Sequence, residues 1–234
     1  MNTRCNAKQL GITTVLFDLN GTLVNDYKTA WNVVTRIFKH FGIESPTLQQ
    51  FRYEFHFPYW TIFTNRGLSD KQAKHDCRKL YARFYEEELD NVQLFQDTTR
   101  CLSELKDSGY RLGLVSQSHR LLLDCLVRKF EISHFFESII SLDDCSEQKP
   151  SPLPLLMCAE RIGAQPRECI YFGDMVEDQH AAYNARMFKG AVTSKGSYHS
   201  IHALQNTSPH ILVSSLKEIP EEITKFENSL VKIC

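Results

Sequence analysis

The segment Phe17–Leu23 (FDLNGTL) holds the first residues in this chain that could do chemistry. Asp18 directly follows an apolar run, Thr14–Phe17. If that run is a buried strand, the Asp18 carboxylate stands at its end as a nucleophile or a metal ligand. Gly21 permits a tight turn whose backbone helps to hold an anion. The competing interpretation is a β-hairpin, because Asn-Gly between apolar runs is a strong hairpin signal.

Two further segments place hydroxyl groups and a cation after apolar runs. Arg111–Ser118 (RLGLVSQS) ends in hydroxyls, and Ser116 could donate a hydrogen bond to a phosphoryl oxygen. An ordinary helix cap is the alternative. Lys149 opens the sequence KPSP, and its ammonium could balance a carboxylate and the charge that develops on a phosphoryl group. The alternative interpretation of Lys149 is a solvated lysine before a proline-rich helix start.

The fourth segment, Tyr171–Asp178 (YFGDMVED), carries two carboxylates four residues apart, Asp174 and Asp178. Two acids beyond a buried strand pack poorly but suit Mg²⁺, a hard cation that prefers oxygen ligands. The alternative is a helix start at which acids interact favourably with the helix dipole. Because the four segments each follow a predicted strand, in order along the chain, one shared site is favoured over four unrelated turns and caps.

The elements that must position these residues are short apolar runs alternating with helical patterns. The predicted strands are Thr14–Phe17, Arg111–Val115, Ser138–Ser141, Cys169–Phe172, Gly190–Thr193 and Ile211–Val213. The predicted helices are Thr98–Lys106, Leu121–Phe130, Leu153–Ile162 and Asp178–Arg186. This alternation predicts an α/β fold, a Rossmann-like doubly wound and mostly parallel sheet with helices on both faces. Ligands of such sheets bind beyond the carboxyl ends of the strands.

The stretch from about Asn25 to Asp97 interrupts this alternation, because it shows helical patterns such as Lys28–Phe41 and Lys71–Glu88 and almost no strand. We therefore expect two domains: a core of residues 1–24 and 97–234, and an inserted helical cap of residues 25–96. Seven aromatic residues crowd into positions 51–63 of the insert. Most should form the core of the cap, and a minority should face the site.

Taken together, FDLNGTL, LGLVSQSHR, KPSP and GDMVEDQHAAYNARM resemble the haloacid dehalogenase-like superfamily of phosphohydrolases. The likeness is greatest to the branch with a helical cap, which includes phosphoglycolate phosphatase-like proteins. The resemblance implies that Asp18 attacks phosphorus and forms an aspartyl-phosphate, which water then cleaves. It implies that Ser116 holds a phosphoryl oxygen and that Lys149 neutralises charge in the transition state.

The resemblance also implies a Mg²⁺ cofactor, held by Asp18, the backbone carbonyl of Asn20, and Asp174. Asp178 belongs to the same acidic set, and we expect it to orient Lys149 or a metal-bound water rather than to bind Mg²⁺ directly. The residues expected to bind the substrate are Gly21, Thr22, Ser116, Gln117 and Arg66. Of these, Arg66 could meet a second anionic group, although a solvated surface arginine is the simpler interpretation.

Asn20 departs from the family pattern, which usually has a second aspartate there as general acid and base. An asparagine can donate an N–H to the leaving oxygen but cannot transfer a proton. General acid–base catalysis is typically worth about 10²–10⁴ in rate. We therefore expect a slow phosphatase, one that favours good leaving groups, or another proton carrier. His119, His180 and His56 are candidates, although each is also typical of an exposed histidine.

Composition narrows the class of protein. The 234 residues carry a net charge of −1, which argues against non-specific nucleic-acid binding. No apolar run approaches the ~20 residues of a membrane span, and no signal-peptide pattern is present. The eight cysteines show no Cys-x-x-Cys and indicate a reducing, cytoplasmic location. His199 and His202 have a spacing that could bind a metal, but without an evident third ligand we interpret them as structural.

The sequence thus predicts an enzyme, a Mg²⁺-dependent phosphoric monoester hydrolase that acts on a small phosphorylated metabolite. We expect no nucleic-acid or membrane partner, and the sequence gives no indication of an oligomeric one. Two alternatives remain. One is a phosphotransferase or mutase of the same superfamily, which passes phosphate to a sugar rather than to water. The other is a catalytically impaired protein that binds a phosphorylated ligand.

Overall fold

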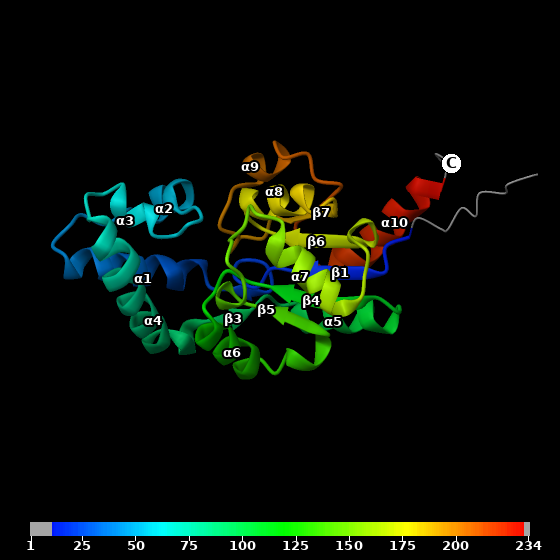
Figure 1. The fold of residues 1–234 in the computed structure, drawn as a ribbon, viewed down its shortest axis with the longest axis horizontal. Helices are drawn as coiled ribbons and strands as arrows, with labels where there is room; N and C mark the ends of the chain where they lie inside the picture. The colour runs from blue at the N-terminus through cyan, green and yellow to red at the C-terminus, as the bar shows by residue number, and fades with distance from the viewer. Residues whose placement is uncertain (1–10, 232–234) are drawn as a thin grey trace, which may run out of the picture.

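The computed structural model describes residues 11–231 and has a six-stranded parallel sheet at its centre (Figure 1). The strand order is β5-β4-β1-β6-β7-β8, and every neighbouring pair is parallel. The strands are β1 (Thr14–Phe17), β4 (Arg111–Val115), β5 (Ser138–Ile140), β6 (Cys169–Gly173), β7 (Phe188–Val192) and β8 (Ile211–Val213). The α/β, Rossmann-like fold class is confirmed, and each of the six predicted strands forms with its boundaries shifted by two residues or fewer.

The central strands are apolar throughout because both of their faces are covered. Side chains alternate between the two faces of a strand. Accordingly, Val15 and Phe17 of β1 pack into one buried cluster, whereas Leu16 packs into another on the opposite face. Ile170 and Tyr171 of β6 divide between the same two clusters. A sheet buried in this way produces continuous apolar runs rather than alternation, which is why the strands are recognisable in the sequence.

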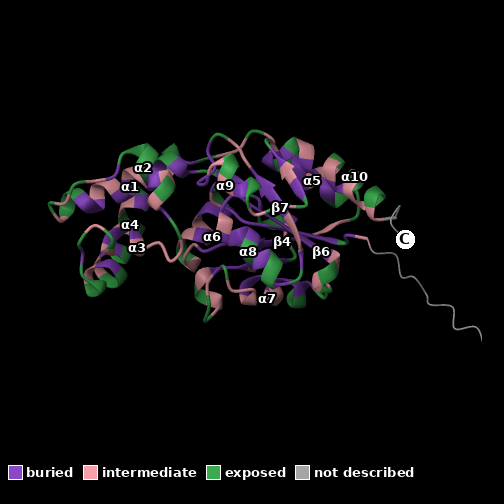
Figure 2. Ribbon diagram, turned by 90° about the horizontal axis from the view of Figure 1, so that it is seen from above, coloured by how far each residue is buried: buried purple, intermediate pink, exposed green. Residues whose placement is uncertain are grey.

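Helices cover both faces of the sheet (Figure 2). One face carries α5 (Thr98–Asp107), α6 (Arg120–Lys129) and α10 (Ile219–Val231), and the other carries α7 (Leu153–Ile162) and α8 (Val176–Asn184). The short helix α9 (Ile201–Gln205) contacts α8. Single 3₁₀ turns occupy Leu89–Asn91, Ser133–Phe135, Leu142–Asp144, Pro166–Glu168 and Leu216–Glu218. Helix α8 begins two residues earlier than predicted, so Asp178 lies in its first turn.

The segment after β1 enters a second, largely helical part of the molecule. Two short strands, β2 (Val24–Asn25) and β3 (Gln93–Leu94), pair antiparallel, and the chain between them is helical. It contains α1 (Tyr27–His40), α2 (Leu48–Glu54), α3 (Thr61–Thr64), a π-helical turn (Gln72–Asp76) and α4 (Cys77–Glu87). Figure 1 shows this helical part at one end of the molecule, beside the sheet.

The hairpin interpretation of Asn20-Gly21 is wrong. Strand β1 lies in the middle of the sheet, where its partners are the parallel strands β4 and β6. The antiparallel partner of β2 is β3, not β1. After Asp18 the chain instead makes a compact turn, in which the amides of Leu23 and Val24 donate to the carbonyl of Leu19. A strand buried on both faces has parallel neighbours available, and these outweigh the local turn signal.

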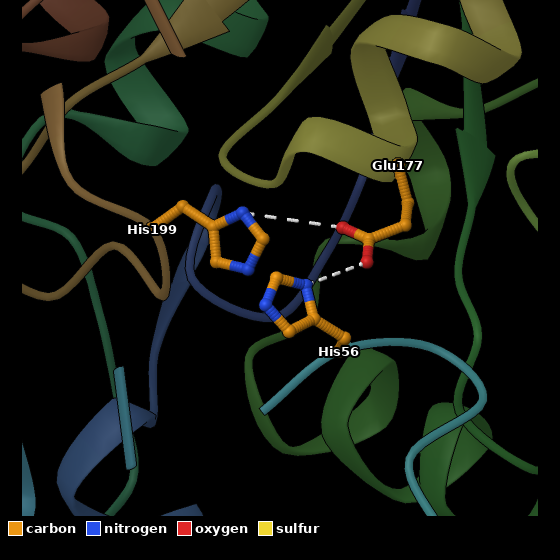
Figure 3. Close-up of side chains that lie close together, drawn as sticks. All are labelled: His56, Glu177 and His199. Atoms are coloured by element: carbon orange, nitrogen blue, oxygen red, sulfur yellow. Dashed lines mark hydrogen bonds and ion pairs between the residues drawn. The ribbon is translucent and has the colours of Figure 1, made fainter. Parts of the chain in front are cut away.

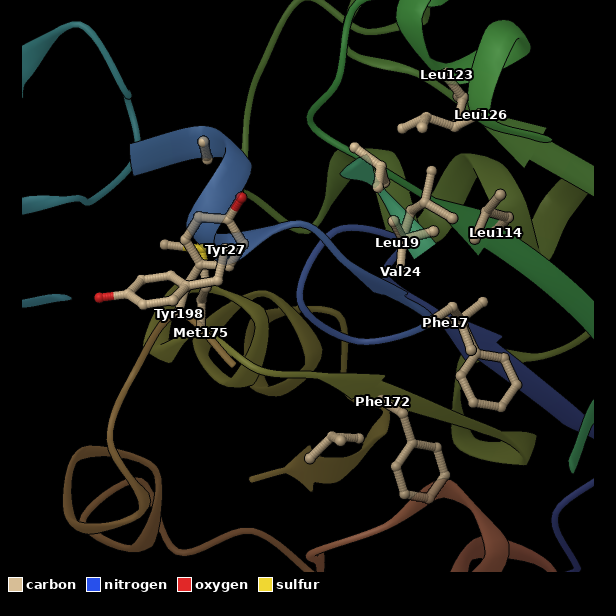
Figure 4. Close-up of a cluster of buried hydrophobic side chains, with 14 of the residues drawn as sticks. Phe17, Leu19, Val24, Tyr27, Leu114, Leu123, Leu126, Phe172, Met175 and Tyr198 are labelled. Carbon is tan, nitrogen blue, oxygen red and sulfur yellow. The ribbon is translucent and has the colours of Figure 1, made fainter. Parts of the chain in front are cut away.

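The hydrophobic core runs without interruption from the sheet toward the helical part (Figure 4). Phe17 of β1 stacks on Phe172 of β6 with ring centroids 5.8 Å apart. Tyr27, at the start of α1, packs edge-to-face against Tyr198, with ring centroids 5.4 Å apart. The base of the helical part is therefore anchored to the sheet by aromatic contacts.

Two further observations concern the helices and the cysteines. None of the helices within residues 11–231 is both long and apolar enough to cross a membrane. The six cysteines within these residues are all free: Cys77, Cys101, Cys125, Cys145, Cys158 and Cys169.

Candidate active site

The carboxyl ends of neighbouring strands bring four segments of the sequence together. Asp18 follows β1, Ser116 follows β4, and Asp174 follows β6, and these three strands are adjacent in the sheet. Lys149 lies in the loop between β5 and α7. All four side chains are buried. The parallel sheet therefore brings residues of the four predicted motifs together, since parallel strands end at one common edge.

Lys149 forms the centre of this cluster. Its Nζ donates hydrogen bonds to Asp18 Oδ1 at 2.7 Å, to Asp178 Oδ1 at 2.6 Å, and to the Tyr171 hydroxyl at 2.8 Å. Burial opposes the charged form, but the two carboxylates outweigh it and raise the pKa of Lys149. Lys149 is therefore an ammonium at neutral pH, with all three of its N–H groups satisfied.

Asp18, Asp174 and Asp178 form a compact carboxylate group, with one oxygen of each lying within 4.8 Å of the others. Burial raises the pKa of Asp18 to about 7, although Lys149 opposes the shift. Burial and the two neighbouring carboxylates raise the pKa of Asp174 well above its usual range. When all three carboxylates are ionised, their charge exceeds that of the single ammonium, and the raised pKa values of Asp18 and Asp174 reflect this repulsion together with burial. The donor set therefore fits a divalent cation with oxygen ligands.

Thr22 and Tyr198 hold Asp174 in place. The Thr22 hydroxyl donates to Asp174 Oδ1 at 3.0 Å, and the Tyr198 backbone N–H donates to Oδ2 at 2.5 Å. The Thr22 hydroxyl is therefore already engaged with Asp174, and its predicted contact with the substrate would compete with this bond. Tyr198 was not predicted, because it lies in a loop after β7 whose path is set by tertiary packing.

Two glycines make the close packing of the carboxylates possible. Gly21 has φ of +80°, and a Cβ there would lie 2.3 Å from Asp174 Oδ2. A Cβ on Gly173 would lie 2.4 Å from Asp178 Cγ. Asp178 also accepts the backbone N–H of Met175 at 3.0 Å on its second oxygen. With one oxygen on Lys149 and the other on this amide, Asp178 is arranged to orient the lysine.

Asn20 is fixed by hydrogen bonds at both ends of its amide. Its Nδ2 donates to Asp26 Oδ2 at 2.6 Å, and its Oδ1 accepts the Ser118 hydroxyl at 2.8 Å. The Ser116 hydroxyl lies 3.4 Å from the same oxygen. Asp26 is buried and also accepts the Tyr85 hydroxyl at 2.6 Å. The amide thus connects the strand-end hydroxyls to a buried carboxyl at the start of α1.

A cavity of about 300 Å³ opens above these residues. Asp18, Asn20, Ser116 and Gln117 form its polar end. Gln117 Nε2 donates to the carbonyl of Lys149 at 3.2 Å, whereas its buried Oε1 has no hydrogen-bond partner among residues 11–231. The remaining walls are mainly aromatic and aliphatic and come from both parts of the molecule: Phe55, Phe57, Tyr59, Tyr81, Tyr85, Leu121, Leu122, Met175 and Tyr198.

The three candidate proton carriers lie in different places. His119 lines the cavity, and its Nδ1 is 2.8 Å from Asp143 Oδ1. His180 is exposed on α8 and does not line this cavity. His56 does not line it either, and its Nδ1 contacts Glu177 Oε1 at 2.9 Å. Of the three, only His119 shares the cavity with Asp18.

Of the predicted substrate-binding residues, Ser116 and Gln117 line this cavity, whereas Gly21, Thr22 and Arg66 do not. Arg66 lies in the helical part. Its Nε and Nη2 donate to the two oxygens of Glu54 at 2.8 and 2.7 Å. Its guanidinium also lies over the ring of Phe38, 5.8 Å from the centroid. Both partners belong to the helical part, so Arg66 supports that part internally.

Tyr171 and Asp26 are site residues that sequence reasoning missed. The Tyr171 hydroxyl accepts from Lys149 and donates to the Val115 carbonyl at 3.1 Å. The sequence did offer a signal for Tyr171, because it places a hydroxyl inside the otherwise apolar run Cys169–Gly173. Asp26 gave no signal, because its partners Asn20 and Tyr85 are 6 and 59 residues away.

Comparisons with known proteins agree with this geometry. A family model described as haloacid dehalogenase-like hydrolase matches residues 15–192. A pyrophosphatase, PpaX, from Bacillus pumilus is 30% identical over 169 residues, which covers 71% of this chain and 76% of that protein. A solved haloacid dehalogenase-like family hydrolase from Streptococcus pneumoniae superposes with a TM-score of 0.78 at 26% identity, covering 90% of this chain and 97% of that one. A predicted phosphoglycolate phosphatase from Haemophilus somnus shares the fold, with a TM-score of 0.77 at 20% identity and coverage of 90% and 97%.

Proposed function

Because this chain belongs to the haloacid dehalogenase-like hydrolase family, we propose that it is a Mg²⁺-dependent phosphatase acting on a small phosphorylated metabolite. Membership confirms the resemblance carried by the four motifs, and it confirms that the chain is a hydrolase whose relatives include phosphatases. The observation that carries the proposal is the buried cluster in which Lys149 contacts Asp18 and Asp178 beside Asp174.

In the proposed reaction, Asp18 is the nucleophile. One of its carboxylate oxygens forms a bond to phosphorus as the bond from phosphorus to the leaving oxygen breaks, which gives an aspartyl-phosphate. Water then attacks this phosphorus and releases inorganic phosphate and the Asp18 carboxylate. Lys149 neutralises the negative charge of the phosphoryl oxygens, and the Ser116 hydroxyl and the backbone around Gly21 donate hydrogen bonds to them.

The carboxylate group supports the Mg²⁺ part of the proposal. Asp18, Asp174 and the backbone carbonyl of Asn20 would hold the ion, and Asp178 would keep Lys149 in place. Bound Mg²⁺ supplies positive charge that offsets the repulsion between the carboxylates and the phosphate. A bound cation is supported by the excess of three carboxylates over one ammonium, because Lys149 is the only buried cation among residues 11–231.

His119 is our candidate for the proton transfer that Asn20 cannot perform. Two neighbours make opposite demands on His119 Nδ1: Asp143 Oδ1, at 2.8 Å, calls for a proton there, and Arg78 Nη2, at 3.2 Å, calls for a lone pair. We assign the proton to Nδ1 because the contact with Asp143 is the shorter one. The Nε2 atom has no hydrogen-bond partner within the described part of the chain and is left to exchange a proton with the leaving oxygen or the attacking water. Arg78, from α4, adds positive charge 3.7 Å from the same Asp143 carboxylate.

The walls of the cavity support an organic substrate. We propose that residues 25–96 form a cap over a core of residues 1–24 and 97–234, and that Phe57 and Tyr59 contact the body of the substrate. Rings and aliphatic side chains make up most of the walls and favour an organic leaving group, although Arg78 and Lys79 also line the cavity. Arg66 is not included in this site. The proposed location is the cytoplasm, which agrees with the free state of all six cysteines within residues 11–231.

The test is phosphate release from p-nitrophenyl phosphate with and without Mg²⁺. The leaving group of this substrate needs little protonation, so the assay isolates the nucleophile and the metal. We expect Mg²⁺-dependent release that Asp18→Asn abolishes, whereas Asp124→Asn, at a half-buried position on α6 outside the cavity, leaves it unchanged. Phosphate release unaffected by Asp18→Asn would overturn the proposal. Equal amounts of nitrophenol and phosphate distinguish hydrolysis from transfer to an added sugar.

A further inference from the structure

A second group of metal-ligand side chains lies outside the proposed active site. His56, Glu177 and His199 converge from three separate segments, as Figure 3 shows. His56 comes from the loop after α2 in the helical part, Glu177 from the first turn of α8, and His199 from the loop before α9. One ligand atom of each residue lies within 4.8 Å of the others.

The two imidazoles present the same nitrogen to one carboxylate. His56 Nδ1 is 2.9 Å from Glu177 Oε1, and His199 Nδ1 is 3.9 Å from Glu177 Oε2. The second nitrogens both face backbone carbonyls: His56 Nε2 lies 3.1 Å from Tyr53 O, and His199 Nε2 lies 3.3 Å from Phe55 O. A histidine that binds a metal through one nitrogen typically donates the N–H of the other to such an acceptor.

The group also combines a buried oxygen that lacks a hydrogen-bond partner with a side chain open to solvent, and both features favour ion binding. Glu177 Oε2 is buried and has no hydrogen-bond partner among residues 11–231. The His199 side chain is 3% exposed and that of His56 is 48% exposed, so an ion can enter from the His56 side. The lone pair of His199 Nδ1 accepts the Val176 backbone N–H at 3.0 Å, and an incoming ion would displace this hydrogen bond.

We propose that His56, Glu177 and His199 bind a divalent transition-metal ion, with Zn²⁺ as the best match, at a site separate from the carboxylates of the active site. Two imidazoles and one carboxylate are a recurrent zinc ligand set, whereas Mg²⁺ prefers oxygen. Because His56 belongs to the helical part and Glu177 and His199 to the sheet-containing part, the bound ion cross-links the two. The proposal goes beyond phosphatase activity and does not depend on it.

The test is calorimetric titration of the full-length protein with Zn²⁺ in excess Mg²⁺, which occupies the oxygen-rich site. We expect the wild type to bind one more equivalent of Zn²⁺ than His56→Ala, or to bind that equivalent at least about tenfold more tightly. His199→Asn should show the same loss. His202→Ala is the matched control, because it removes an exposed histidine three residues from His199, and it should bind as the wild type does. Zn²⁺ should also raise the Tm of the wild type more than that of His56→Ala.

Identical Zn²⁺ stoichiometry and affinity in the wild type and His56→Ala would overturn the proposal and leave His56–Glu177 as an ion pair. Loss of the Zn²⁺ equivalent in His202→Ala would also overturn it, by locating the ion on the surface. If the buried His199→Asn variant fails to fold, the half-exposed His56 decides the outcome alone. Retained phosphatase activity in His56→Ala would show that this site and the active site are distinct.

Discussion

At the scale of single residues, the most consequential position is Asn20. Its amide nitrogen donates to Asp26 and its oxygen accepts from Ser118, so the side chain is held in one orientation and carries no transferable proton. Whatever proton transfer the reaction needs must therefore come from another group in the cavity. His119, held by Asp143, is the titratable side chain placed for this role.

We expect His119→Gln to slow hydrolysis of an alkyl phosphate by about 10²–10⁴, because a poor leaving group needs a general acid. The same variant should slow hydrolysis of p-nitrophenyl phosphate far less. The measurement is kcat for both substrates, with His180→Gln on the exposed surface of α8 as the control. Equal losses for the two substrates would mean that His119 positions the substrate and does not transfer a proton.

The predicted residues that the structure brings together are mostly those that directly follow a strand. Asp18, Ser116 and Asp174 each follow an apolar run, and parallel strands bring such positions together without further information. Arg66 could not be placed in this way. Its position depends on how α2 and α3 pack, and its pairing with Glu54 becomes visible only in three dimensions.

At the scale of elements, the turn between β1 and β2 determines how closely the motifs approach. Gly21 combines a φ of +80° with the close approach of Asp174, and both features exclude a side chain. Gly42, after α1, offers a natural comparison: its φ is +68°, but a Cβ placed there would meet no atom beyond its chain neighbours within 4 Å.

We expect Gly42→Ala to lower the free energy of unfolding by about 1 kcal/mol, because it forces alanine into a left-handed conformation. Gly21→Ala should lower it by more, because its methyl group would also overlap Asp174 and Tyr198. Only Gly21→Ala should also abolish Mg²⁺-dependent turnover, since its methyl group would displace the Asp174 carboxylate. Urea unfolding of both variants measures the loss of stability, and phosphate release measures the loss of turnover. A turnover loss in Gly42→Ala comparable to that in Gly21→Ala would contradict it.

The contact of His210, the residue before β8, with strand β7 carries a pH dependence. His210 packs edge-on against Phe188 of β7, and its Nδ1 accepts the Lys189 backbone N–H at 3.0 Å. Partial burial of its ring, assisted by Lys189, lowers the pKa of His210. A lowered pKa in the folded state means that protonation favours unfolding, so this contribution to stability is complete above the usual histidine pKa of about 6.5 and is lost as pH falls below it.

We therefore expect the wild type to lose more stability than His210→Asn between pH 7.5 and pH 5.5. Urea unfolding at the two pH values measures this difference, and His202→Asn, at an exposed position in α9, is the control. If His210→Asn loses more stability than the wild type between these pH values, the pKa of His210 is not lowered in the folded protein, and the prediction is wrong.

The sheet was predictable to within two residues at each strand end because continuous burial leaves continuous apolar runs. The short elements could not be predicted from the sequence. The pair β2–β3 has two residues in each strand, too few to show a period, and it forms because two distant segments meet. Helix α4 was predicted within Lys71–Glu88, but a π-helical turn at Gln72–Asp76 replaces its first part.

At the scale of the whole molecule, the cavity lies between the sheet-containing part and the helical part. The sheet-containing part supplies Asp18, Asn20, Ser116 and Gln117, and the helical part supplies rings from the aromatic-rich stretch, including Phe57 and Tyr59, together with Arg78 and Lys79 of α4. This division separates the residues of the proposed chemistry from those of the proposed substrate selection. Phe51 and Phe63 of the same stretch are fully buried, whereas Tyr53 is 66% exposed.

We expect Phe57→Ala to lower kcat/KM for phenyl phosphate by about 2- to 10-fold, the equivalent of roughly 0.5–1.5 kcal/mol for one aromatic contact. Hydrolysis of inorganic pyrophosphate, which has no apolar body, should change little. Tyr53→Ala removes an exposed ring from the same stretch and should affect neither substrate. An equal loss for phenyl phosphate and pyrophosphate would show that Phe57 supports the fold and does not select the substrate.

The pairing of β2 with β3 also has a consequence for how the chain folds. Strands β1 and β4 are neighbours in the sheet, yet some ninety residues separate them along the sequence. Once Val24 pairs with Leu94, the intervening helices form a closed loop and only short segments remain between the two strands. The entropic cost of joining β1 to β4 then falls to that of a short connection, so early formation of this small ribbon would accelerate assembly of the central sheet.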